Sequence, residues 1–69
     1  MINIYQKLGQ NVRKYRERAR LTQDQLCDKA DVSQYYLSQI ENGRRKPTLD
    51  ILDKISTALS IPLYYFLKF

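Results

Sequence analysis

The 69-residue sequence predicts an all-α fold, and three of its features support that prediction. Apolar residues recur every three or four positions, as they do on the buried face of a helix. No segment alternates apolar and polar residues between turn signals, which would indicate a strand. Only two glycines and two prolines interrupt the chain, which has no internal repeat or low-complexity linker. We therefore expect one helical domain over residues 1–69.

The first expected helix runs from Asn3 to about Arg20. Its apolar residues form one stripe that faces a core: Ile4, Leu8, Val12, Tyr15 and Ala19. Gly9 lowers the helix propensity, which is understandable only where another backbone packs closely against it. Arg16 lies beside the stripe, so its long side chain should be partly buried and should need a carboxylate partner.

Two short helices joined by a tight corner are expected over Gln23–Asn42. Thr22 and Gln25 have the spacing of a capping box, which satisfies free backbone N–H groups where a helix begins. Asp31 ends the second helix, because Asp tolerates a left-handed backbone better than most residues, and Ser33 caps the third. The residues that face the corner are small or aliphatic: Leu26, Cys27, Ala30, Val32, Leu37 and Ile40.

The outer face of the third helix is polar but uncharged. That face consists of Gln34, Tyr35, Ser38 and Gln39, with Tyr36 at its margin. Asn42 and Gly43 end the helix, and the basic loop Arg44–Lys46 follows directly. A mere αα-corner would show the same buried pattern. Hydrogen-bonding side chains beside clustered cations, however, are what a DNA-reading helix-turn-helix needs.

A fourth helix capped by Thr48 and a short fifth helix over Leu63–Leu67 complete the expected fold. Their inward residues are Leu52, Ile55 and Leu59 in the fourth helix, and Leu63 and Phe66 in the fifth. The last seven residues, LYYFLKF, carry more aromatic surface than one short helix needs for its own core.

The composition favours a polyanionic partner and excludes several kinds of site. Twelve Lys and Arg against seven acids give a net charge of +5, which makes nucleic acid the first candidate. Without His there is no His-containing zinc site, and the single Cys27 cannot form an internal disulfide. One thiol fits a reducing cytoplasm, and no apolar stretch approaches the roughly 20 residues that span a membrane. We expect a cytoplasmic protein.

Enzymatic activity is not expected. The sequence shows no paired acids in an obvious cleft, no phosphate-binding glycine loop and no His to activate Cys27 as a nucleophile. No catalytic residue, metal or cofactor is therefore predicted. RNA is a minor alternative partner because of the six tyrosines, although these do not match the sheet-based stacking platform of common RNA modules.

The sequence resembles the Cro and cI-type (XRE-like) helix-turn-helix family, which has the phage-repressor fold. The resemblance extends over nearly the whole chain, through Leu8–Arg13, Leu21–Leu26, Val32–Ser33, Ile40–Gly43, Lys46–Pro47, Leu52, Ile55, Ala58–Leu59 and Ile61. Cys27, Asp31 and Ser56 depart from the residues common in the family, but each is small or suits the backbone. The resemblance implies a compact five-helix, lambda-repressor-like domain whose helices 2 and 3 form the helix-turn-helix. No separate ligand-sensing or oligomerisation domain is expected.

The resemblance also implies which residues contact DNA. The third helix would lie in the major groove, with its early side chains at the base edges. The implied base-reading residues are Gln34, Tyr35 and Gln39; Gln34 comes first because a Gln amide can pair bidentately with adenine. The implied phosphate contacts are Gln23, Ser38, Asn42, Arg44 and Arg45. Arg16 and Glu41 should form a partly buried ion pair.

Two functions of different classes remain open for this sequence. The first is a sequence-specific transcriptional regulator, most simply a repressor, that binds an inverted repeat in double-stranded DNA as a homodimer. A restriction-modification controller is a variant of it. Its expected dimer interface is the apolar surface made by Ile51, Tyr64, Tyr65 and Phe69. The second function is that of an antitoxin-like or other protein-interaction module, whose aromatic C-terminal end binds a partner protein.

Overall fold

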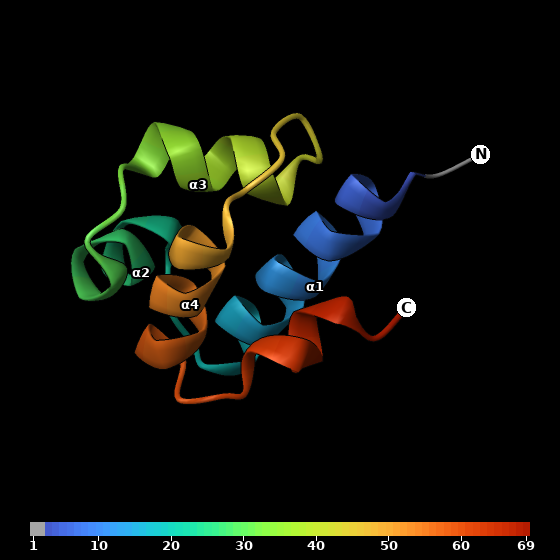
Figure 1. Ribbon diagram of the computed structural model, residues 1–69. Helices are drawn as coiled ribbons and strands as arrows, with labels where there is room; N and C mark the ends of the chain where they lie inside the picture. Colours follow the sequence, from blue (N-terminus) through green and yellow to red (C-terminus); the bar gives the residue numbers. More distant parts are fainter. Residues whose placement is uncertain (1–2) are drawn as a thin grey trace.

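The computed structural model describes residues 3–69, which fold into four α-helices and one short 3₁₀ helix (Figure 1). Their bounds are α1 Ile4–Arg18, α2 Gln23–Ala30, α3 Gln34–Glu41, α4 Leu49–Ala58 and η1 Leu63–Leu67. No strand occurs in this part of the chain, so the all-α prediction is confirmed. No helix within residues 3–69 combines the length and the apolar character needed to cross a membrane.

The prediction of five α-helices is wrong for the fifth helix, because η1 is a 3₁₀ helix. Its five residues follow Pro62 without a side-chain cap, and they are too few to recover the cost of nucleating an α-helix. Short connections commonly take the 3₁₀ form. The Asn11 side-chain amide on α1 donates to the carbonyl oxygens of Phe66 at 2.8 Å and Lys68 at 3.0 Å. These two bonds fasten η1 to α1.

Helix α1 has a shorter buried stripe than the sequence predicts. The helix ends at Arg18, and Arg20 adopts a left-handed backbone with a φ of 60°. Ala19 therefore lies exposed outside the helix. Ile4, in the first turn, is 56% exposed because this turn lies at the rim of the molecule (Figure 1). The buried stripe is thus confined to the middle of α1.

The corner between α2 and α3 forms as predicted. Thr22 Oγ1 accepts from the N–H of Gln25 at 3.1 Å, and Gln25 Oε1 accepts from the N–H of Thr22 at 2.8 Å. Asp31 follows α2 in the left-handed conformation, with φ 57° and ψ 50°. Ser33 Oγ accepts from the N–H of Tyr36 at 3.1 Å and caps α3. The sequence therefore specifies both helix starts and the turn between them.

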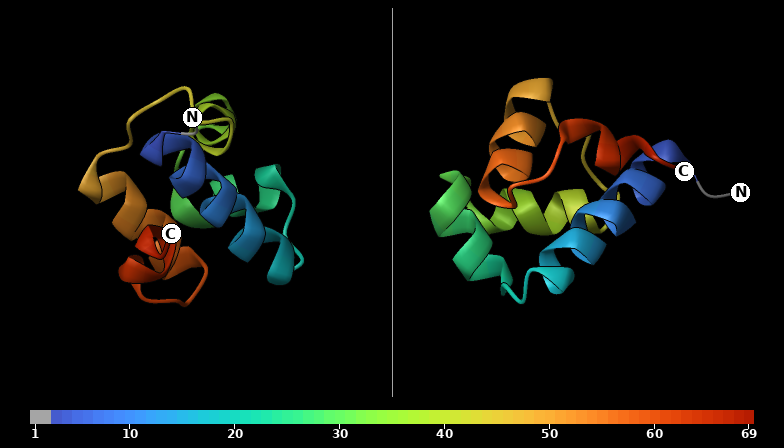
Figure 2. Two further views of the ribbon diagram at one scale, coloured as in Figure 1. Left: turned by 90° about the vertical axis from the view of Figure 1, so that its right-hand side faces the viewer. Right: turned by 90° about the horizontal axis from the view of Figure 1, so that it is seen from below.

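The buried core lies between the helices, and all five elements contribute to it (Figure 2). Its largest fully buried side chains are Val12, Leu26, Leu37, Ile40, Ile55 and Phe66. Helix α1 packs against α3 and η1, whereas α2 packs against α3 and α4. Cys27 is part of this core, and burial raises the pKa of its thiol. A neutral buried thiol serves packing.

Gly9 allows α1 to approach α3 closely. A Cβ atom at this position would lie 2.2 Å from the carbonyl oxygen of Ile40 and 2.8 Å from that of Glu41. Both neighbours are backbone atoms that cannot rotate away, so a larger residue would push the two helices apart. The close backbone contact explains the glycine at this position, and it fixes the position of α3 relative to α1.

Candidate nucleic-acid interface

Helix α3 presents a polar face at the edge of the molecule, with no other element over it (Figure 1). Gln34 is exposed, Tyr35 is 68% exposed and Gln39 is half-buried. On the opposite side of the helix, Leu37 and Ile40 are each 1% exposed. The structure thus brings the three residues implied as base readers onto one uncovered helix, and an α-helix fits the width of the major groove.

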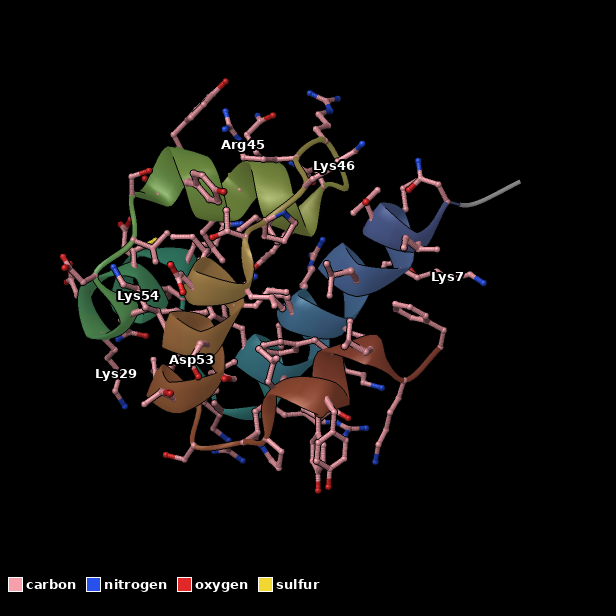
Figure 3. The ribbon with its side chains drawn as sticks, in the orientation of Figure 1. Lys7, Lys29, Arg45, Lys46, Asp53 and Lys54 are labelled. Atoms are coloured by element: carbon pink, nitrogen blue, oxygen red, sulfur yellow. The ribbon has the colours of Figure 1, made fainter. Side chains whose placement is uncertain are left out.

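The segment that presents this face is itself acidic. Residues 22–42 contain four acids, Asp24, Asp28, Asp31 and Glu41, against the one base Lys29. Lys29 points away from α3, whereas Arg45 and Lys46 lie on the loop beside its C-terminal end (Figure 3). All three cations of Arg44–Lys46 are exposed. This loop therefore places three cations where a polyanion at α3 would need neutralising charge.

A tight backbone turn keeps the basic loop Arg44–Lys46 beside α3. Gly43 adopts a φ of 72°, a conformation that costs glycine little. Its N–H donates to the carbonyl oxygen of Ile40 at 3.0 Å, and the N–H of Arg44 donates to that of Gln39 at 2.9 Å. These bonds occupy carbonyls at the end of α3 and start the loop at a fixed point.

Two tyrosine rings lie beneath side chains of the basic loop, which the sequence did not predict. The guanidinium carbon of Arg45 lies 4.7 Å from the centroid of the Tyr36 ring on α3. Lys46 Nζ lies 5.4 Å from the centroid of the Tyr5 ring on α1. Both distances are in the range of cation–π contacts. No local spacing rule could have found these pairs, because each joins a loop residue to a helix that only the fold brings near.

Arg16 on α1 and Glu41 on α3 lie together beneath the candidate interface. Arg16 Nε donates to Glu41 Oε2 at 2.7 Å, and its Nη2 donates to Oε1 at 3.1 Å. A third group, Nη1, donates to the carbonyl oxygen of Leu21 at 2.8 Å. The two side chains are 11% and 3% exposed. The hydrogen bond to Glu41 raises the pKa of Arg16 above its ordinary value, so the guanidinium stays charged.

Gln23 connects a third helix, α2, to this ion pair. Its side-chain Nε2, at the start of α2, donates to Glu41 Oε1 at 3.1 Å, and the residue is half-buried. Asn42, at the end of α3, is exposed, and Ser38 on its second turn is half-buried. The structure therefore gathers α1, α2 and α3 around one buried carboxylate, that of Glu41 at the end of α3.

The residues of the expected dimer interface lie on α4 and on the C-terminal end of the chain. Ile51 on α4 and Tyr65 on η1 are half-buried, whereas Tyr64 and Phe69 are 59% and 61% exposed. The rings of Tyr64 and Tyr65 lie edge to face, with centroids 5.3 Å apart. Leu67 is 47% exposed and was missed by the sequence analysis, because the apolar side chains of a short helix do not show which of them face outwards.

Two short helices joined at a left-handed corner, the second with an uncovered polar face, define a helix-turn-helix protein. The model of the HTH_3 helix-turn-helix family matches residues 12–66. The chain therefore belongs to the HTH_3 family, which is the Cro/C1 type of helix-turn-helix, and the predicted family is confirmed.

Three proteins illustrate what this chain is similar to. It is 41% identical over 54 residues to the immunity repressor protein of Bacillus phage phi105, covering 78% of this chain and 38% of the repressor. It is 38% identical over 60 residues to control protein C.BamHI of Bacillus amyloliquefaciens, covering 86% of this chain and 74% of that protein. Among solved structures, the restriction-modification controller protein C.AhdI from Aeromonas hydrophila matches with a TM-score of 0.88. That match has 29% identity and covers 90% of this chain and 94% of the other.

These relatives carry the names of regulators and not of enzymes. The chain spans 38% of the length of the phage repressor, so the similarity concerns only part of that longer protein. It matches nearly the whole of C.AhdI, which has the same fold.

Proposed function

We propose that this chain binds double-stranded DNA in a sequence-specific manner and regulates transcription, most simply as a repressor. The observation that carries the proposal is the exposed, uncharged face of α3 beside the three cations of Arg44–Lys46. Such a helix fits the major groove, where side-chain amides can read base edges and nearby cations can neutralise phosphates. The similarity to an immunity repressor and a control protein supports the regulatory role.

In this proposal α3 enters the groove with its N-terminal residues at the base edges. Gln34 and Tyr35 occupy its first turn, and Gln39 follows one turn later on the same side. The Gln34 amide would pair with adenine, and the Tyr35 ring would contact a thymine methyl or a phosphate. The phosphate contacts would come from Gln23, Ser38, Asn42, Arg44 and Arg45. Gln23 would contribute through the part of its side chain that the hydrogen bond to Glu41 leaves exposed.

A comparison of Gln34→Ala with Arg44→Ala tests these assignments. Gln34→Ala should weaken binding to a selected site by about 1–3 kcal/mol and should hardly change binding to random DNA. Arg44→Ala should weaken both duplexes alike and reduce the slope of log affinity against log salt by about 1. Fluorescence anisotropy on duplexes of equal length, over a range of salt concentrations, measures both effects. If the two variants behave alike on both duplexes, α3 is not the sequence reader.

The regulator is proposed to bind an inverted repeat as a homodimer. Helix α3 has eight residues, and a helix of that length measures only about 12 Å. One copy would read too few base pairs to select a site, whereas two copies read two half-sites about 34–36 Å apart. The proposed interface consists of the exposed Tyr64 and Phe69 with the half-buried Tyr65 and Ile51, because exposed apolar surface usually has a partner.

The double substitution Tyr64→Ser and Phe69→Ser should convert the dimer into a monomer, because it removes the two most exposed aromatic side chains of the proposed interface. Tyr35→Ser is the control: it removes a tyrosine of α3 that is even more exposed, at 68%, and it should leave the dimer intact. Sedimentation velocity at high micromolar concentration measures the association state. A monomeric wild-type protein at that concentration would rule out the proposed homodimer.

The same exposed C-terminal side chains favour a second candidate function, an antitoxin-like or other protein-interaction module. In that case the aromatic end would bind a partner protein, and DNA binding would be secondary. The Tyr64→Ser and Phe69→Ser variant would then lose copurification with the product of a neighbouring gene. Its affinity for an inverted repeat would be unchanged, whereas loss of the proposed dimer would lower that affinity.

A further inference from the structure

We propose that Tyr36 and Tyr5 are positioning residues whose rings hold Arg45 and Lys46 ready to contact phosphate groups. The inference rests on the proposed DNA-binding function and deepens it. Neither ring is assigned a contact with the DNA itself. Each acts through the cation above it, so the two tyrosines would set affinity without setting sequence preference.

The rings and the cations differ in how firmly the fold holds them. Tyr36 and Tyr5 are half-buried and pack against the hydrophobic core, so their positions are fixed by α3 and α1. Arg45 and Lys46 are exposed on the loop between α3 and α4, and their heads lie 4.7 Å and 5.4 Å from the ring centroids. Each fixed ring therefore restricts where a flexible cation can go.

A cation resting on a ring remains able to bind a phosphate. A guanidinium carries five N–H donors in a fixed fork, and one aromatic ring cannot engage all of them, so Arg45 can rest on Tyr36 and still donate to a phosphate. Lys46 keeps ammonium donors that point away from the Tyr5 ring. Within residues 3–69 the salt bridges join Arg13 to Glu17 and Arg16 to Glu41, and neither Arg45 nor Lys46 takes part in one. No carboxylate thus competes with phosphate for them.

Preorganisation of these cations matters because of the charge around α3. The acids of residues 22–42 outnumber the bases, so the cations of the loop bring needed positive charge next to the reading face. Long cationic side chains lose rotamer freedom when they bind, and a ring that already restricts them reduces that loss. Phosphates are common to all duplexes, so removing a ring should weaken selected and random DNA equally.

A double-mutant cycle between Tyr36 and Arg45 tests the inference, with affinities for a selected and a random duplex measured by fluorescence anisotropy. Tyr36→Leu should weaken binding to both duplexes about two- to five-fold, which corresponds to one exposed cation–π contact. In the Arg45→Ala background the same Tyr36→Leu substitution should have almost no effect. Tyr36→Phe keeps the ring and should retain the wild-type affinity. A parallel cycle between Tyr5→Leu and Lys46→Ala should show the same coupling.

Two outcomes would overturn the inference. The first is a Tyr36→Leu substitution that lowers DNA affinity equally in the wild-type and Arg45→Ala backgrounds, which would show that the ring acts independently of the cation. The second is a loss on Tyr36→Phe as large as on Tyr36→Leu, which would assign the effect to a hydroxyl contact. Tyr35→Leu is the control, since no cation lies over that ring in the described part of the chain. Its effect should be the same in the Arg45→Ala background and larger on the selected duplex.

A measurement without DNA separates failure of the inference from failure of the proposed function. In NMR spectra of the free protein, the Arg45 side-chain protons should be shifted upfield by the Tyr36 ring current. The shift should persist in Tyr36→Phe and vanish in Tyr36→Leu. An unshifted Arg45 in the wild-type protein would refute the ring contact itself. A shifted Arg45 in a protein that binds no duplex would refute the DNA-binding function instead.

Discussion

Replacing Glu41 by alanine is expected to lower the free energy of unfolding by about 3–5 kcal/mol. The substitution leaves the Arg16 guanidinium in a largely buried position without its carboxylate, and it removes the acceptor of the Gln23 amide. A buried charge without a partner costs far more than the pair itself contributes. Urea unfolding followed by circular dichroism measures the loss.

The exposed pair of Arg13 and Glu17 provides a matched control for Glu41. Its atoms lie 3.4 Å apart with side chains 61% and 57% exposed, so Glu17→Ala should cost no more than about 0.5 kcal/mol. A loss for Glu41→Ala as small as that for Glu17→Ala would show that the buried pair does not hold the helices together.

The pH dependence of the Glu41→Ala loss follows from the raised pKa of Arg16. Because the folded-state pKa lies above the unfolded one, the contribution of the Arg16 charge is fully present below the unfolded-state pKa. It is lost only as the pH rises through the still higher folded-state pKa. Arginine titrates far above neutral pH. The decrease in the free energy of unfolding caused by Glu41→Ala should therefore be the same at neutral and at mildly alkaline pH.

Replacing Gly9 by alanine is expected to have the second largest effect on stability, a loss of about 1–3 kcal/mol. Helix propensity alone predicts the opposite sign, because alanine stabilises a helix interior by about 1 kcal/mol relative to glycine. The contact decides the sign, since the added methyl would lie 2.2 Å from the carbonyl oxygen of Ile40. Helices α1 and α3 would have to separate, which would also strain the bond between Arg16 and Glu41.

Gln10→Ala is the control for this substitution, because Gln10 is the exposed neighbour of Gly9 in the same helix. It should change the free energy of unfolding by no more than about 0.5 kcal/mol. Thermal unfolding of both variants at one protein concentration makes the comparison. A Gly9→Ala protein as stable as the wild type would show that α1 and α3 do not need their close contact.

The features of the fold that could be predicted from sequence are those with a local cause. Thr22 with Gln25, and Asp31 with its left-handed backbone, each act within a few residues, and their roles were predicted. For Gly9 the sequence left only the condition that another backbone packs closely, and the structure meets it. The capping box of Asn3 and Gln6 has an equally local signal and was overlooked.

The features that could not be predicted depend on distances between elements. The end of α1 at Arg18 follows from the left-handed backbone of Arg20, a residue type that carries no turn signal. The 3₁₀ form of η1 depends on how few residues follow Pro62 before its contact with α1. The Tyr36 and Arg45 contact joins a helix residue to a loop residue that only the fold brings near, so a linear pattern cannot show it.

The claim that α3 reads DNA sequence is tested most directly by selecting bound duplexes from a random pool with the purified protein. We expect enrichment of an inverted repeat whose half-site centres are about 10–10.5 base pairs apart. We also expect Gln34→Ala to relax the preference at one position within each half-site. Recovery of sequences no different from the starting pool, by a protein that circular dichroism shows to be folded, would contradict sequence reading by α3.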